Sequence, residues 1–225
     1  MKLIFLHGLG QRAHDWQPVV NCIPGNNVDC PELFLLPSGE KTYPHILAAL
    51  EKRYVEEREL LLLCGLSLGA VLALDYTIRH GDKVAGLVLI APQYKVPGWL
   101  IRLQNWMFRC MPETAFTDIG MTRAEVIALC GSMQTIDFTA QLYRISCPVK
   151  LLCGGRDLAN KAACRKLQKL LPQAELEFMP GIGHEMNREA PQAVAAEVWQ
   201  LQNKIMGTAA GSSSALHPAQ AYVQK

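Results

Sequence analysis

Residues 60–69 read Leu-Leu-Leu-Leu-Cys-Gly-Leu-Ser-Leu-Gly, an apolar strand pattern that runs into G-x-S-x-G. Residues 70–79 follow at once and have the composition of a helix. A strand, a tight turn and a helix in this order place Ser67 at the apex of the turn, with its Oγ at the positive end of the helix. Gly65 and Gly69 lack the side chains that would keep strand and helix apart. The stretch predicts a nucleophilic serine, although alone it also fits a turn with a capping serine.

A second glycine-rich turn follows the first apolar run of the chain. Residues 3–6 are Leu-Ile-Phe-Leu, and residues 7–10 are His-Gly-Leu-Gly. Acyl transfer needs two N–H donors aimed at the oxyanion, each worth about 3 kcal/mol of the barrier. We assign these donors to the backbone N–H groups of Leu9 and Leu68. His7 is expected to brace this turn.

Two further strand patterns end in a candidate acid and a candidate base. Residues 148–153 run into Gly-Gly-Arg-Asp at 154–157, and residues 176–179 are followed by Pro-Gly-Ile-Gly and His184. A carboxylate just past a strand end can reach the edge of the sheet where Ser67 lies. A histidine on a glycine-rich turn has the freedom to lie over the serine. The chain order is Ser67, Asp157, His184.

With these motifs the sequence resembles the α/β-hydrolase family, in particular its small single-domain esterase, lipase and C–C hydrolase branch. The matching segments are HGLG (7–10), GLSLG (65–69), GGRD (154–157) and GIGHEMNREAP (181–191), and the resemblance covers residues 1 to about 203. It implies a catalytic triad of Ser67, Asp157 and His184. Many members begin with two further strands. This chain starts at the strand before HGLG, so a sheet of about six strands is expected in place of the usual eight.

The alternation of patterns predicts a doubly wound α/β fold with a mostly parallel sheet. Strands are expected near 2–6, 28–34, 60–64, 85–90, 149–153 and 175–179, and helices near 42–56, 68–80, 160–171 and 190–205. The hydrolase domain is expected to span 1–206, with a small helical cap inserted at about 93–140. Residues 207–225 are small and polar, which is typical of a flexible tail.

The cap segment is rich in large apolar residues, and from 97 to 111 they recur at helical spacing. Trp99, Trp106 and Met107 are the candidate substrate-binding residues on this helix. Lys95 and Arg109 fall on its other side together with Arg102. We interpret the segment as a lid whose apolar side roofs the pocket. The alternative is contact with a lipid interface, because tryptophan opposite basic residues is also the pattern of membrane-surface helices.

Composition agrees with an ordinary enzyme of one domain. The 225 residues are 50% hydrophobic and 19% charged with a formal net charge of +2, which gives no basis for nucleic-acid binding. No signal peptide or membrane-spanning run is recognisable, and stable membrane insertion is not expected. The eight cysteines lack a C-x-x-C pair and are interpreted as reduced thiols in a cytoplasmic protein. No metal site and no cofactor are expected, and the chain is expected to be a monomer or homodimer.

These observations predict a serine hydrolase that cleaves small-molecule carboxylic esters with apolar acyl or alcohol groups. The same triad also serves thioesterases, lactonases, C–C bond hydrolases and a menaquinone-pathway lyase, because the chemistry depends on the pocket. A member of another class, a non-enzymatic protein that binds a small ligand on this fold, is a third possibility.

Overall fold

The computed structural model describes residues 1–207 except 26, 38, 97 and 119, and the side chains of 99, 100 and 102–104 are outside the described part. Within it, six strands form one sheet in the order β2-β1-β3-β4-β5-β6, and all neighbours are parallel. The strands are β1 (Lys2–Leu6), β2 (Val28–Asp29), β3 (Leu61–Leu66), β4 (Val84–Ile90), β5 (Val149–Gly154) and β6 (Ala174–Met179). The predicted fold class and the sheet of about six strands are confirmed.

Helices cover both faces of the sheet. They are α1 (Gln17–Val20), α2 (Tyr43–Tyr54), α3 (Leu68–Arg79), α4 (Gly98–Cys110), α5 (Thr114–Thr117), α6 (Arg123–Ser132), α7 (Leu158–Leu170), α8 (Met186–Glu189) and α9 (Pro191–Met206), with 3-10 turns at Ala13–Trp16, Gly81–Lys83 and Leu142–Arg144. One apolar core lies between the sheet and α2, α3 and α7, and a second lies between the sheet and α1, α8 and α9. Central strands buried on both faces explain the near-continuous apolar runs in the sequence.

The edge strand β2 is shorter than predicted. We expected a strand over 28–34, but the ladder with β1 ends at Asp29. Pro31 comes two residues later and has no N–H to donate to a ladder. The apolar residues that suggested a longer strand, Leu33 and Phe34, are buried in a turn instead.

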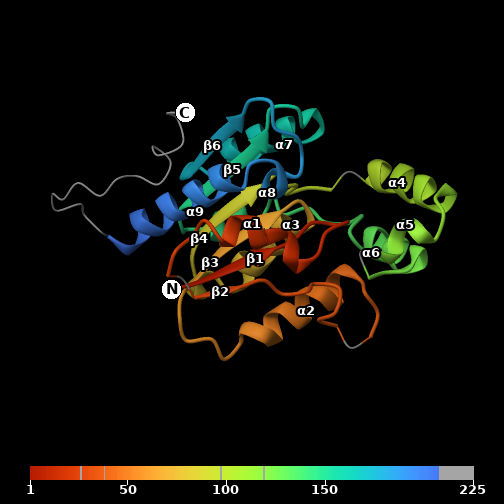
Figure 1. Ribbon diagram of the computed structural model, residues 1–225, viewed down its shortest axis with the longest axis horizontal. Helices are drawn as coiled ribbons and strands as arrows, with labels where there is room; N and C mark the ends of the chain where they lie inside the picture. Colours follow the sequence, from red (N-terminus) through yellow and green to blue (C-terminus); the bar gives the residue numbers. More distant parts are fainter. Residues whose placement is uncertain (26, 38, 97, 119, 208–225) are drawn as a thin grey trace.

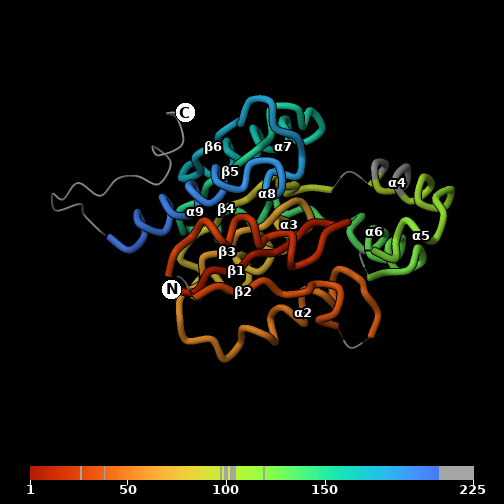
Figure 2. Tube along the Cα trace, in the orientation of Figure 1, coloured from red at the N-terminus to blue at the C-terminus, as the bar shows by residue number. Residues whose placement is uncertain are grey.

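The cap is the segment between β4 and β5, and it holds α4, α5 and α6. Figure 1 shows these three helices together beyond one end of the sheet, on the side away from the N-terminus. The trace in Figure 2 leaves the sheet after β4, passes through the cap and returns into β5. Helix α6 packs against both α4 and α2, so the cap is seated on the body of the domain. Among the described helices, none has the length and apolarity needed to cross a bilayer.

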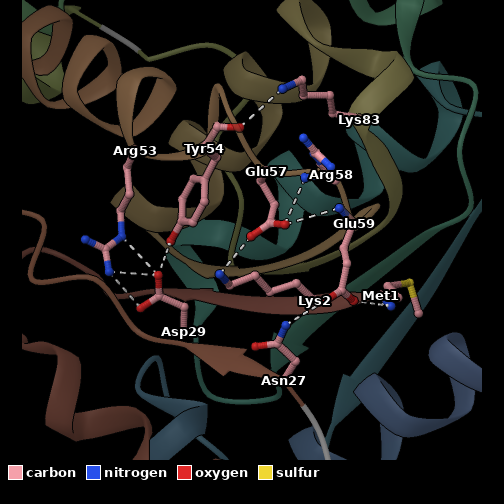
Figure 3. Close-up of polar contacts among 10 residues, drawn as sticks. All are labelled: Met1, Lys2, Asn27, Asp29, Arg53, Tyr54, Glu57, Arg58, Glu59 and Lys83. Carbon is pink, nitrogen blue, oxygen red and sulfur yellow. Dashed lines mark hydrogen bonds and ion pairs between the residues drawn. The ribbon is translucent and has the colours of Figure 1, made fainter.

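A cluster of polar contacts surrounds β2 and the amino-terminal end of β1 (Figure 3). Asp29 accepts hydrogen bonds from Arg53 Nε and from the Tyr54 hydroxyl, both at 2.9 Å. Lys2 Nζ forms an ion pair with Glu57 at 2.9 Å. These contacts tie the start of the sheet to the end of α2.

All eight cysteines lie in the described part of the chain and carry free thiols there. Cys64 in β3 and Cys153 in β5 are buried, whereas Cys110 is exposed. Burial raises the pKa of the Cys130 thiol to about 12. A thiol with so high a pKa is a poor nucleophile at neutral pH.

Candidate active site

Ser67 lies at the turn between β3 and α3 with a backbone conformation that is rare for a residue with a side chain. Its φ is 53° and its ψ is −110°. Its N–H donates to the carbonyl of Ile90 at 2.9 Å, which fixes the turn to the neighbouring strand. A Cβ on Gly69 would lie 2.0 Å from the carbonyl oxygen of Leu6, and one on Gly65 would lie 2.4 Å from the carbonyl oxygen of Gly69. Both glycines therefore permit the close approach of strand and helix that the sequence motif predicts.

His184 and Asp157 face one another from two adjacent loops. His184 Nδ1 lies 2.7 Å from Asp157 Oδ2, so Nδ1–H donates and Nε2 is left as the acceptor that a general base requires. This hydrogen bond raises the pKa of His184. Burial alone would raise the pKa of Asp157, but the hydrogen bonds from His184 and Asn160 lower it below its usual value. A Cβ on Gly154 would lie 1.9 Å from the carbonyl oxygen of Gly183, so the two loops touch.

Ser67 and His184 line one cavity of about 750 Å³ between the cap and the carboxyl ends of the strands. This volume falls within the usual range for small-molecule sites. Much of the wall is apolar and comes from α3 and the cap: Val71, Val96, Ile101, Phe108, Met111, Ala115, Phe116, Val126, Leu129, Cys130 and Met133. Polar groups from Gln93, Asp118, Asn160 and Arg188 complete it.

Leu9 and Leu68, the expected oxyanion donors, line the same cavity as Ser67. Leu68 is the first residue of α3, so its N–H has no acceptor within the helix. The turn that carries Leu9 is braced by His7, whose Nε2 accepts a hydrogen bond from Leu33 N–H at 3.1 Å and whose Nδ1 lies 3.0 Å from the carbonyl oxygen of Gly8. Burial lowers the pKa of His7, which keeps the ring neutral and able to accept from Leu33.

The orientation of α4 differs from the expectation for the substrate-binding residues. Trp106 and Met107 are 63% and 49% exposed, and among the described residues the cavity is lined from this helix by Ile101 and Phe108. Each residue turns a helix by about 100°, so Trp106 lies roughly 140° around α4 from Ile101 while Phe108 lies within roughly 20° of it. The side of α4 that was predicted to roof the pocket thus faces away from the cavity at Trp106 and Met107. The side chain of Trp99 lies outside the described part.

Asn160 and Gln93 are polar residues near Asp157 that the sequence motifs did not predict as part of the site. Asn160 Nδ2 lies 2.9 and 2.8 Å from the two carboxylate oxygens of Asp157. Gln93 Nε2 donates to Asn160 Oδ1 at 2.6 Å. Gln93 lies just past the end of β4, at the same edge of the sheet as Ser67. Asn160 follows Asp157 by three residues in the first turn of α7, and this spacing was the available signal.

Comparison with known proteins agrees with this arrangement. Residues 3–197 match the family model described as the alpha/beta hydrolase family. The chain belongs to the alpha/beta hydrolase family. The predicted family membership is confirmed, because the match covers most of the chain.

Individual relatives and solved structures are also similar to the chain. It is 26% identical to the biotin biosynthesis bifunctional protein BioHC of Cellvibrio japonicus over 87% of this chain and 46% of the relative. It is 34% identical to the pimeloyl-[acyl-carrier protein] methyl ester esterase of Photorhabdus laumondii over 40% of this chain and 35% of the relative. The alignments thus span less than half the length of either relative. A thermophilic esterase from Thermogutta terrifontis has the same fold, with a TM-score of 0.73 and 20% identity over 91% of this chain and 90% of the esterase.

Proposed function

We propose that this chain is a serine hydrolase that cleaves carboxylic esters through Ser67, His184 and Asp157. The observation that carries the proposal is the strained serine at the head of α3, which shares a cavity with a histidine already hydrogen-bonded to a buried carboxylate. A strained backbone persists only where the surrounding structure maintains it, and it is concentrated at active sites. A capping serine in an ordinary turn would need neither this backbone nor these neighbours.

The proposed reaction has two steps. In the first, Ser67 Oγ attacks the ester carbonyl as His184 Nε2 takes the hydroxyl proton, and the Leu9 and Leu68 N–H groups hold the oxyanion. The C–O bond to the alcohol then breaks, and the alcohol leaves with the proton from His184. In the second step, water loses a proton to His184 and attacks the acyl group on Ser67. The acid leaves, and the proton returns to Ser67 Oγ.

The cavity supports uncharged esters with an apolar acyl or alcohol part. Residues from α3 and α6, including Val71, Val126 and Leu129, are buried and present apolar side chains to the cavity. Burying each CH₂ group of a substrate chain against such a wall contributes about 0.8 kcal/mol. A chain of several carbons therefore gains substantial binding energy there. The likeness to a methyl ester esterase that acts on a pimeloyl group supports including methyl esters among the substrates tested.

The test is hydrolysis of p-nitrophenyl esters from acetate to laurate, and of dimethyl pimelate, by the wild type and Ser67→Ala. Replacing a triad nucleophile is expected to lower kcat by about 10⁶-fold. Ser146→Ala is the matched control, because Ser146 is exposed on a loop outside the described cavity lining and should keep full activity. A fluorophosphonate probe should label Ser67 in the wild type. Equal esterase activity in the wild type and Ser67→Ala would refute the proposal.

A further inference from the structure

The catalytic carboxylate of the proposed site has a second partner besides the histidine. Asn160 Nδ2 donates to Asp157 Oδ1 at 2.9 Å and to Oδ2 at 2.8 Å, and it lies 3.3 Å from His184 Nδ1. Asp157 is 8% exposed. The amide therefore lies beside the hydrogen bond between Asp157 Oδ2 and His184 Nδ1, which orients the histidine ring.

The orientation of this amide is fixed by Gln93. The side chain of Asn160 has an acceptor end and a donor end, and the donor end must face Asp157 for these contacts to form. Gln93 Nε2 donates to Asn160 Oδ1 at 2.6 Å, so the acceptor end faces Gln93. Gln93 comes from the segment that follows β4, and Asn160 from the first turn of α7, which follows β5. The two strands are neighbours in the sheet, and this brings the two amides together.

Asp157 also occupies the position that precedes α7, where an aspartate side chain usually accepts hydrogen bonds from the free N–H groups of the helix. The Asp157 side chain makes no such capping hydrogen bond here and lies against His184 and Asn160 instead. Asn160 supplies two donor contacts to the carboxylate in its outward orientation, and hydrogen bonds to a charged group are among the stronger ones in proteins.

We propose that Asn160, oriented by Gln93, is a positioning residue that holds Asp157 against His184 Nδ1. This inference rests on the proposed function of the site. In each turnover His184 must accept the proton from Ser67 at Nε2, and the ring can do so only while Asp157 keeps Nδ1 as the donor. Gln93 affects Asp157 only through Asn160, so its contribution to kcat by this route depends on the presence of that amide.

The experiment measures kcat and KM for the ester that the wild type hydrolyses best, in Asn160→Ala, Asn160→Asp, Gln93→Ala and the double variant. Misplacing a catalytic group by about 1 Å can lower the rate by about 10²-fold, and we expect kcat of Asn160→Ala to fall by about 10- to 100-fold with KM within about 3-fold. Asn160→Asp has nearly the same shape but no donor, and it should lose as much. The effect of Gln93→Ala should be smaller and should vanish when Asn160 is already alanine.

The dependence of kcat/KM on pH distinguishes the positioning role of Asn160 from a purely structural one. The groups that raise the pKa of His184 are Asp157, Glu185 and Cys153. The hydrogen bond to Asp157 is the largest of these causes, and without Asn160 the carboxylate is no longer held against Nδ1, so the pKa of His184 should fall and the acidic limb of the profile should move to lower pH in Asn160→Ala. Loss of packing alone would leave the limb in place. Asn21→Ala is the matched control, because Asn21 is exposed on α1's carboxyl side and contacts Gln17.

Three results would overturn the positioning role: an unchanged kcat in Asn160→Ala, an unmoved acidic limb, or effects of the two alanine substitutions that multiply in the double variant. Thermal melting of each variant shows whether it is folded, and Asn160→Asp serves where the alanine variant melts early. Ser67→Ala is measured in the same series. Loss of activity there beside full activity in Asn160→Ala rejects the positioning role alone. Activity retained in Ser67→Ala rejects the proposed function and this inference together.

Discussion

A pair of buried amides joins the segment after β1 to α8, and its removal should lower the stability of the fold. Gln11 and Asn187 are 1% and 0% exposed. Gln11 Nε2 donates to Asn187 Oδ1 at 3.1 Å, and Asn187 Nδ2 donates to Gln11 Oε1 at 3.2 Å and to the carbonyl oxygen of Asp15 at 3.1 Å. The perturbation is a double-mutant cycle of Gln11→Ala and Asn187→Ala.

The magnitude follows from the groups that each substitution leaves without a partner. Gln11→Ala removes two hydrogen bonds and leaves Asn187 Oδ1 buried and unpaired, while the bond to Asp15 survives. An unpaired buried polar group costs about 1–3 kcal/mol, and we expect each single variant to lose about 2–3 kcal/mol once lost packing is included. In a domain of this size the melting temperature should fall by about 4–12 °C. In the double variant neither amide is left alone, so the losses should fall short of their sum by about 1–3 kcal/mol.

The assay is urea unfolding followed by circular dichroism, with one exposed amide pair as the control. Gln17 Nε2 donates to Asn21 Oδ1 at 2.7 Å on the surface, so the same cycle there removes the same chemistry in water. Its coupling energy should be under about 0.5 kcal/mol. A buried pair whose coupling is no larger than that of the exposed pair would refute the reasoning. Ester hydrolysis by the single variants then shows whether the Gln11–Asn187 pair also affects kcat.

Two further predictions concern His7 and Gly69. Burial lowers the pKa of His7, so below pH about 6.5 the unfolded chain binds a proton that the folded chain does not, and the free energy of unfolding should fall as pH decreases from there. Urea titrations between about pH 7.5 and 5.5 should show that the free energy of unfolding falls less steeply in His7→Gln than in the wild type. Equal slopes in the two proteins would contradict the assignment of this pH dependence to His7. Gly69→Ala places a Cβ 2.0 Å from the backbone oxygen of Leu6 and should destabilise the fold by more than about 3 kcal/mol. Gly39→Ala is the control, because a Cβ there meets nothing within 4 Å. Its free energy of unfolding should stay within about 0.5 kcal/mol of the wild-type value.

Most of the sheet could be predicted from the sequence, because central parallel strands appear as apolar runs bounded by glycine and polar residues. Five of the six strands lie within two residues of their predicted bounds. The edge strand β2 was predicted too long. Leu33 and Phe34 are apolar because a turn buries them, and hydrophobicity alone does not distinguish a buried turn from a strand.

In the cap, the sequence predicts a helix but not its orientation. The helix at Gly98–Cys110 follows from its spacing of apolar residues, but the side that faces the cavity does not. Apolar and basic residues fall on different sides of α4, but this spacing does not show which side meets the cavity. Packing against α6 and the mouth of the cavity selects Ile101 and Phe108 as the inward residues and leaves Trp106 exposed.

By itself the sequence determined the strand–turn–helix around Ser67 and the order of the candidate triad, because tight turns and close backbone approach require glycine at particular positions whatever surrounds them. The tertiary structure alone decided which polar groups meet at Asp157. Gln93 and Asn160 are 67 residues apart in the chain, and Gln11 and Asn187 are 176 apart. Such contacts depend on which strands are neighbours and on their register, and no local pattern of residues encodes either.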